Sequence, residues 1–292
     1  MFERLRRRED VVFDPDVAHA ALIYDDMARP ILEAVHRQYI DIAQRHALPM
    51  LVSASTWRAN GERVARSRHA GAPVNQQNIA FARQVADAGG SPGAPLFVAG
   101  TMGPAGDAYR AGEAPDREAA MRFHEYQVDA LADGCPDLLM AATLPALPEA
   151  LGIAQLLGAT ALPYLLSFVV REGGMLLDGT PLAVALDRID NTCPQPPVGY
   201  MVNCVHPDVL DRCLDVGGSA VAGRVLGLRA NTSTLRPEQL DDAESLVTQP
   251  ADELATHMAT TQRRHGLKIL GGCCGTGTEH IEQIAVRCAR AA

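Results

Sequence analysis

Short apolar segments alternate with amphipathic segments from one end of the chain to the other. Within each apolar segment the hydrophobic residues are consecutive rather than alternate, which is typical of parallel strands buried on both faces. The predicted strands are Val11–Asp14, Pro49–Ala54, Pro95–Thr101, Asp137–Thr143, Pro163–Val169, Val198–Cys204, Val225–Asn231 and Lys268–Cys274.

The segments between these strands carry apolar residues at the spacing of one helix face. Predicted helices cover residues 27–46, 75–88, 116–133, 147–158, 181–190, 207–214, 250–265 and 277–290. Several begin at a proline followed by an acidic residue, a common start signal.

Strands that alternate with helices in a chain of 292 residues predict an α/β fold, a (β/α)₈ TIM barrel. A doubly wound open sheet is the alternative. Because no linker or change of composition divides the chain, we expect a single domain over residues 1–292.

The bulk composition limits the possible partners. The chain has 26 basic and 35 acidic residues and a net charge of −9, which argues against binding to nucleic acid or an anionic membrane. It has no apolar stretch long enough to span a bilayer, and its charged N-terminus is unlike a secretory signal. Seven scattered cysteines favour a reducing compartment and metal or catalytic use. We therefore expect a cytoplasmic protein.

Three cysteines end predicted strands. Cys273 and Cys274 lie in the run LGGCCGTG at the end of the last strand, and Cys204 ends the sixth. Strands of a barrel end at one rim, so the three thiols are expected to meet there and to bind Zn²⁺ with one position left open. Alternatively, they are small buried residues, or Cys273 and Cys274 form a disulfide. The other cysteines are interpreted as small buried residues: Cys135, Cys193, Cys213 and Cys288.

Zinc held by three thiolates favours a particular chemistry. A substrate thiol can bind as the fourth ligand and lose its proton near neutral pH. The resulting sulfur nucleophile would attack a methyl group on a sulfonium or ammonium donor. The predicted cofactor is Zn²⁺, and the predicted partners are a small thiol and a methyl donor. No phosphate-binding glycine loop opens a strand–helix unit, so we expect no nucleotide cofactor.

Each of four other side chains at the predicted rim has two alternative roles. Asp14 either contacts substrate or caps a turn. Trp57 either flanks a cationic donor with its ring face or packs in the core. Arg58 and Arg171 either bind a substrate carboxylate or form surface ion pairs.

Polar residues also surround the end of the sixth strand and follow the seventh. Asn203 is expected to hydrogen-bond a zinc thiolate. For His206, a solvated or capping role is favoured over that of a general base. Asn231, Thr232 and Ser233 end the seventh strand, where substrate-recognition groups usually lie in a barrel.

The run GGCCGTGTEHI (271–281), with MVNC (201–204) before it, resembles the homocysteine S-methyltransferase family. That family includes the betaine–homocysteine methyltransferases and the homocysteine-binding module of cobalamin-dependent methionine synthase. Similar segments are HRQYIDIA (36–43), AGTMGP (99–104) and LLDGTPL (176–182). The resemblance implies a zinc-dependent (β/α)₈ barrel with Cys204, Cys273 and Cys274 as ligands.

The chain departs from the family at two substrate-binding positions. Pro15 follows Asp14 where members usually have glycine, and Ala142 precedes Thr143 where members carry a glutamate that helps to hold the amino group of homocysteine. We expect a zinc-dependent S-methyltransferase that moves a methyl group from a sulfonium, an ammonium or a corrinoid protein to homocysteine or a related thiol. The alternatives are a transferase acting on another thiol or a selenol, and a non-catalytic zinc- or thiol-binding barrel.

Overall fold

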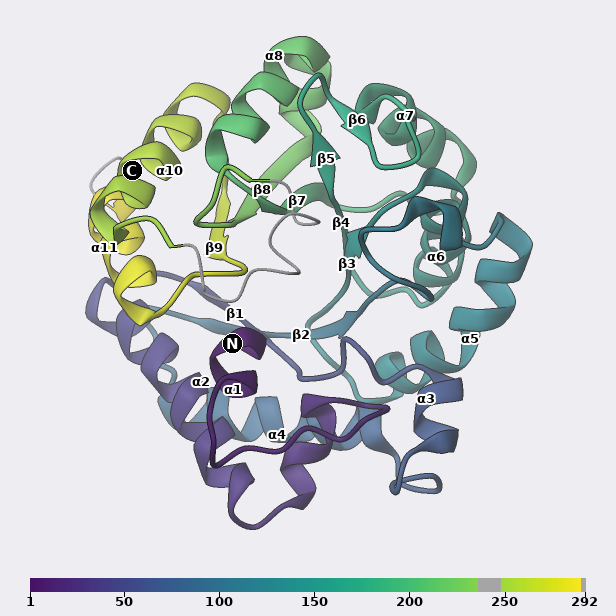
Figure 1. Cartoon of the computed structure of the whole chain (residues 1–292), viewed down its shortest axis with the longest axis vertical. Coiled ribbons are helices and arrows are strands. Elements are labelled where there is room, and N and C mark those ends of the chain that lie inside the picture. The colour runs from purple at the N-terminus through teal and green to yellow at the C-terminus, as the bar shows by residue number, and fades with distance from the viewer. Residues whose placement is uncertain (236–247, 290–292) are drawn as a thin grey trace.

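The protein is described by a computed structural model that covers residues 1–235 and 248–289. Seven parallel strands form one curled sheet in the order β1-β2-β3-β4-β7-β8-β9, and helices surround it (Figure 1). The strands are β1 (Met50–Ser53), β2 (Leu96–Met102), β3 (Leu138–Leu144), β4 (Tyr164–Phe168), β7 (Gly199–Val205), β8 (Val225–Ala230) and β9 (Ile269–Gly272).

The order of the strands in the sheet follows their order in the chain. This order is that of a (β/α)₈ barrel, whereas a doubly wound sheet reverses direction part-way. The predicted barrel class is confirmed, and the prediction of a single domain stays a prediction. The predicted helices form as α2 (Ala28–Arg45), α4 (Val74–Gly89), α5 (Arg117–Asp133), α6 (Leu147–Ala159), α7 (Leu182–Thr192), α8 (Pro207–Arg224), α10 (Ala251–His265) and α11 (Thr278–Ala289).

The first predicted strand, Val11–Asp14, is wrong. Asp14 forms only an isolated bridge with Ala18, and Val12 is 78% exposed. The Asp14 carboxylate accepts backbone hydrogen bonds from Asp16 and Val17, which turns the chain away from an extended path, and Pro15 has no N–H for a ladder. The described sheet therefore ends at β1 and β9, and β9 is half-exposed along its whole length.

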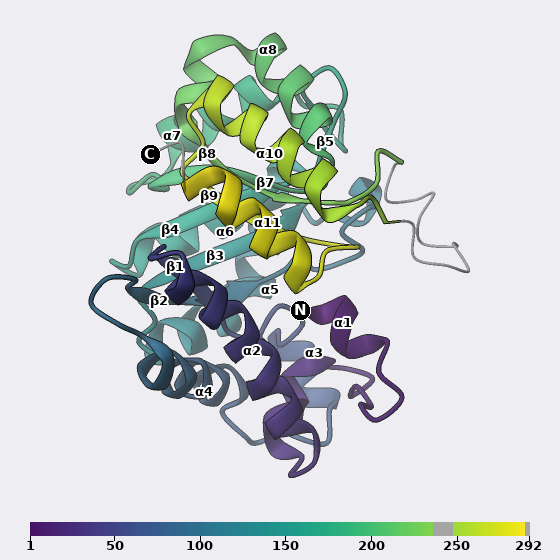
Figure 2. The same ribbon diagram turned by 90° about the vertical axis from the view of Figure 1, so that its left-hand side faces the viewer.

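Several short elements were not predicted. They are α1 (Phe2–Arg6), the 3₁₀ helices η1 (His19–Tyr24) and η2 (Ala111–Glu113), α3 (Gly61–Arg66) and the hairpin of β5 (Val170–Arg171) with β6 (Met175–Leu176). Figure 2 shows α1 at the same end of the barrel as the loops that follow β8 and β9. Helix α8 is longer than predicted and is kinked at Gly218, whose φ is +70°.

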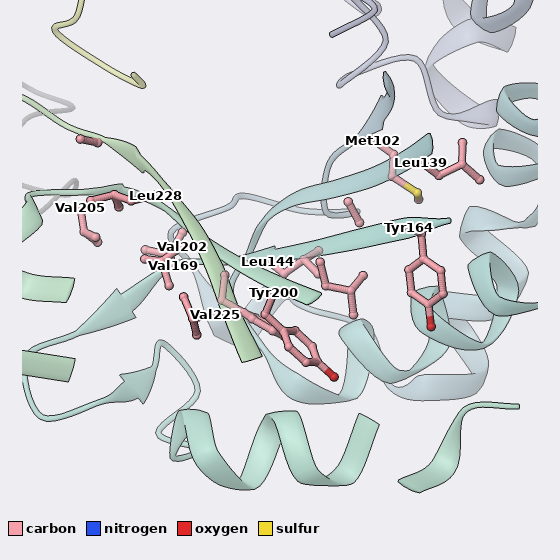
Figure 3. Packing of buried hydrophobic residues seen from close by; sticks show 14 of the residues in the cluster. Met102, Leu139, Leu144, Tyr164, Val169, Tyr200, Val202, Val205, Val225 and Leu228 are labelled. Atoms are coloured by element: carbon pink, nitrogen blue, oxygen red, sulfur yellow. The ribbon is translucent and has the colours of Figure 1, made fainter. Parts of the chain in front are cut away.

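Buried hydrophobic residues form an outer layer and an inner cluster. The outer layer lies between the strands and the helices and includes Leu139, Tyr164 and Tyr200 (Figure 3). The inner cluster fills the barrel with residues that alternate with these along the strands, among them Met140 and Met201. Among the described residues, no helix is both long and apolar enough to cross a lipid bilayer.

The α5–α6 contact gives a direct test of this packing. A Cβ at Gly152 of α6 would lie 2.5 Å from the carbonyl oxygen of Arg117 and 2.8 Å from Cβ of Ala120. We expect Gly152→Ala to lower the free energy of unfolding by about 1–3 kcal/mol, measured by urea denaturation. Gly223 of α8 has open space at its Cβ position, so Gly223→Ala should be neutral or stabilising by up to about 1 kcal/mol. Equal effects of the two substitutions would contradict the packing argument.

Candidate metal centre and acceptor site

The three cysteines at the rim of the barrel converge. Their Sγ atoms all lie within 4.8 Å of one another. Cys204 lies near the end of β7, and the loop with Cys273 and Cys274 follows β9. The N–H of Cys273 donates to the carbonyl of Ala230 over 2.7 Å, and the N–H of Thr232 donates to that of Cys274 over 3.3 Å. Backbone hydrogen bonds to β8 and its loop thus hold this loop in place.

In this structure Cys204 and Cys273 form a disulfide with a Cα–Cα distance of 5.5 Å, and Cys274 is free. The disulfide therefore does not join the adjacent pair Cys273 and Cys274. Tetrahedral zinc with Zn–S bonds of about 2.3 Å needs sulfur atoms roughly 3.8 Å apart. The spacing of the three sulfur atoms fits such a donor set once the disulfide is reduced to thiolates. Burial raises the pKa of the Cys274 thiol, and a bound metal ion would replace its proton.

The backbone is strained at two rim positions. Cys204 has a φ of +58° and Thr143, at the end of β3, has a φ of +68°. A positive φ is unfavourable for a β-branched residue such as Thr143, and such strain is concentrated at functional sites. In both strands the register of the ladder shifts at this residue.

Asn203 holds these two residues together. Its Oδ1 accepts hydrogen bonds from the N–H of Thr143 over 3.0 Å and from the hydroxyl of Ser167 over 2.5 Å. Its Nδ2 donates to Oγ1 of Thr143 over 2.9 Å and lies 3.3 Å from Sγ of Cys204. The amide therefore uses both ends and contacts Cys204, and its hydrogen bond to a zinc-bound thiolate stays a prediction.

The glycine after the cysteines is required by the fold of the loop. Gly275 has a φ of +81°, and a Cβ there would overlap the hydroxyl of Thr232. Thr232 and its neighbour Asn231 are buried beside the cysteine loop. Ser233 is also buried, and its hydroxyl accepts the N–H of Leu235. The three polar residues after β8 thus pack at the rim, and their contact with substrate stays a prediction.

Both carboxylate oxygens of Asp14 accept hydrogen bonds from other groups of the protein. Oδ1 accepts from the N–H groups of Asp16 and Val17 over 2.9 and 3.0 Å, and Oδ2 lies 3.2 Å from Nε of Arg68. Burial alone would raise the pKa of Asp14, but these hydrogen bonds hold it below its ordinary value. The structure therefore gives Asp14 the turn-capping contacts, and contact with substrate stays a prediction.

Trp57 faces the rim at the end of β3. Its Nε1 donates to the carbonyl of Ala142 over 3.2 Å, and a Cβ at Gly103 would overlap its ring. The guanidinium of Arg58 lies 4.6 Å from the centre of the Trp57 ring, which places the protein's own cation over one ring face. Burial lowers the pKa of Arg58.

The remaining predicted residues lie in different settings. Arg171 is in the β5–β6 hairpin, outside the barrel sheet. His206 is buried rather than solvated and caps α8, since its Nδ1 accepts the N–H of Asp208 over 3.3 Å. Its Nε2 lies 3.0 Å from Oε1 of Gln249, whose carbonyl is 3.0 Å from Nε2 of His280. Burial lowers the pKa of His206, so the structure favours the capping role.

Two polar residues of the barrel interior were missed by the sequence analysis. Ser167 lies in β4 and donates to Asn203, and Arg229 lies in β8 opposite Asn203 of β7 and Gly271 of β9. Each interrupts an otherwise apolar strand. That interruption is the signal by which they could have been found.

The model of the homocysteine S-methyltransferase family matches residues 1–288. The chain belongs to this family. The resemblance inferred from the cysteine motif is therefore confirmed. Members of the family are methyltransferases that act on a thiol, and the match extends over nearly all of this chain.

Individual relatives are distant. The chain is 26% identical to methionine synthase of Mycobacterium leprae over 92% of its own length but only 22% of that protein. It is 27% identical to the homocysteine S-methyltransferase YbgG of Bacillus subtilis, over 65% of this chain and 60% of that protein. It is 28% identical to the homocysteine S-methyltransferase of Escherichia coli, over 66% of this chain and 63% of that protein. The chain thus spans less than two thirds of these relatives.

Solved structures support the fold. The oxidised form of the homocysteine methyltransferase MmuM of Escherichia coli has a TM-score of 0.75 and 23% identity, and covers 98% of this chain and 93% of its own. Its metallated form has a TM-score of 0.69 and 24% identity, and covers 92% of this chain and 88% of its own. At this identity the likeness establishes the barrel fold.

The buried Asp14 carboxylate predicts a specific pH dependence. Its pKa in the folded protein lies below the value of about 3.9 in the unfolded chain. The stability that it contributes is therefore present above that value and is lost as the pH falls through the folded pKa. We expect the free energy of unfolding of the wild type to fall more steeply between about pH 5 and pH 2 than that of Asp14→Asn.

The control is Asp26→Asn, at an exposed aspartate that forms no ion pair in the described part of the chain. Urea denaturation at each pH gives the free energies, and this variant should follow the wild type. Parallel curves for Asp14→Asn and the wild type would mean that the Asp14 contacts do not favour its charged form.

Proposed function

We propose that the protein is a zinc-dependent S-methyltransferase that transfers a methyl group to a thiol, either homocysteine or a related acceptor. The observation that carries this proposal is the meeting of Cys204, Cys273 and Cys274, whose Sγ atoms lie within 4.8 Å of one another. Three sulfur donors from two strand ends make a metal site with one open position. The metallated form of MmuM supports metal binding in a related barrel.

The chemistry follows from this donor set. Zinc, when bound, would take the acceptor sulfur as its fourth ligand and lower the pKa of that thiol. The acceptor sulfur forms a bond to the methyl carbon while the bond from that carbon to the donor breaks, and the thiol proton passes to solvent. The donor is a sulfonium, an ammonium or a corrinoid on a partner protein, since each presents an electrophilic methyl group.

The chain's own residues prepare the site. Nδ2 of Asn203 donates toward Sγ of Cys204, which draws charge from that sulfur and fixes its direction. The amide is held in turn by Thr143 and Ser167, so that it cannot rotate away. Buried Asn231 and Thr232 close the side of the site next to β8.

Two features of the rim favour a related thiol over homocysteine as the acceptor. The carboxylate of Asp14 is engaged by two backbone N–H groups and by Arg68. Ala142, buried next to Thr143, offers no carboxylate. A substrate ammonium group would therefore find no free carboxylate at either position. A barrel that binds zinc and thiols without catalysis is the remaining alternative, and methyl transfer separates the two.

Zinc content tests the metal centre. We expect about one zinc ion per chain in protein purified under reducing conditions without chelator. Cys204→Ala and Cys273→Ala should each lose the stoichiometric metal and methyl transfer to every thiol tested, because three thiolates are needed. Cys135 is exposed, so its prediction as a small buried residue is wrong, and Cys135→Ala should keep both the metal and the activity. Full zinc and activity in either ligand variant, by elemental analysis and product assay, would refute the assignment.

The Asn203 amide gives a second test. We expect Asn203→Ala to lower zinc affinity or methyl transfer by about 10- to 100-fold, because the sulfur of Cys204 and the strained Thr143 both lose their partner. Zinc affinity is measured by competition with a chromophoric chelator. Asn191→Ala, at an exposed asparagine of α7, is the matched control. An unchanged zinc affinity and rate in Asn203→Ala would show that the amide only packs.

A further inference from the structure

The interior of the barrel changes from apolar to polar toward the rim. The inner cluster consists of apolar side chains that point into the barrel, among them Met140, Leu165 and Met201. Because side chains alternate along a strand, the next inward position lies two residues further on. Those positions hold Ala142, Ser167 and Asn203. The site at the rim is thus lined by small and polar groups above an apolar floor.

Arg229 belongs to the same polar layer. It is in register with Asn203 of β7 on one side and with Gly271 of β9 on the other. Paired residues of neighbouring parallel strands face the same side of the sheet, so its side chain enters the barrel with that of Asn203. A Cβ at Gly271 would lie 3.7 Å from Cγ of Arg229. The arginine therefore extends over the bare backbone of β9, directly below the cysteine loop.

This cation has no acidic partner in residues 1–235 and 248–289. Burial lowers the pKa of Arg229, and no carboxylate offsets that effect. Glu3, whose charge is close enough to act on Cys274, is already paired with Arg6 and Arg7 at 3.3 and 3.5 Å. Arg229 is only partly exposed to solvent. A poorly solvated guanidinium without a counter-ion is unfavourable unless an anion completes it.

We propose that Arg229 binds the carboxylate of the acceptor, and that the acceptor is a small thiol that carries a carboxylate but needs no ammonium group. The planar guanidinium matches a carboxylate with two parallel hydrogen bonds. The thiol then lies toward the cysteines and the carboxylate toward β8, along one side of the rim. This inference rests on the proposed function, since it names the acceptor class of the same site.

Among the described residues, neither Asp14 nor Ala142 offers a free carboxylate to an ammonium group. Asp14 is engaged by Arg68 and by two backbone groups, and Ala142 is apolar. An ammonium group would lose water without gaining a charged partner. The site therefore favours a mercapto-carboxylate over an amino acid of the same length.

Three thiols of equal chain length separate these contributions: 4-mercaptobutanoate, homocysteine and 4-mercaptobutan-1-ol. The first two differ only in the ammonium group, and the first and third differ in the carboxylate. We expect the Co²⁺-loaded protein to bind 4-mercaptobutanoate about 10- to 100-fold more tightly than the alcohol, and at least as tightly as homocysteine. Sulfur-to-cobalt absorption reports binding without any methyl donor.

Arg229→Met should abolish the preference for the carboxylate over the alcohol, and Arg229→Lys should keep part of it. Arg188→Met, at an exposed arginine of α7, should bind like the wild type. Affinity for the metal itself, measured without thiol, should be unchanged in all three variants. These results together would assign the carboxylate to Arg229.

Three outcomes would overturn the inference. A preference for the carboxylate that survives in Arg229→Met would place the anion elsewhere. A loss of metal affinity with no change in thiol preference would make Arg229 a counter-ion for the cysteine thiolates. Much tighter binding of homocysteine than of 4-mercaptobutanoate would reveal an ammonium site. By contrast, carboxylate binding that depends on Arg229 without methyl transfer to any thiol would contradict the proposed function and support the anion subsite.

Discussion

The lateral pairing of β7, β8 and β9 is the constraint on which the rest of the site depends. The parallel register places Asn203 opposite Arg229 and Arg229 opposite Gly271. A backbone hydrogen bond also joins the N–H of Cys273 to the carbonyl of Ala230. Each contact is local, yet together they fix two cysteine-bearing strand ends at one rim. A shift of β9 by one residue would turn the cysteine loop to the other face of the sheet. The three cysteines are therefore positioned by the ladder rather than by the loop alone.

Strain and polarity at this rim have a common explanation. Thr143 and Cys204 adopt positive φ values, and the buried amide of Asn203 bonds to both. Neither feature stabilises a barrel, because strained residues and buried amides favour folding only when every partner is present. The outer apolar layer between strands and helices supplies the stability that permits them. A polar layer thus lies above the apolar cluster, at the end of the barrel where the cysteines lie.

The repeating strand–helix units of this structure were predictable from the sequence. Seven of the eight expected strands form, because consecutive apolar residues bounded by helix signals leave few other solutions. The cysteine motif indicated which thiols meet at the rim. The first strand failed at Asp14, where a side chain that accepts two backbone N–H groups competes with extended structure. Arg229 was missed because its role depends on which residues lie across the sheet, and periodicity along one strand carries no such information.

The loss of the first strand and the position of Arg229 belong together. With Val11–Asp14 turned away, the described sheet ends at β1 and β9, and the Asp14 carboxylate is consumed by the turn and by Arg68. The inward polar residues found in the strands near the rim are Ser167 of β4, Asn203 of β7 and Arg229 of β8. Arg229 is the charged one among them for which the described residues show no carboxylate partner. On the proposed assignment the acceptor is recognised from β8, beside the cysteine sulfurs, rather than by Asp14, and a carboxylate is the group that Arg229 can receive.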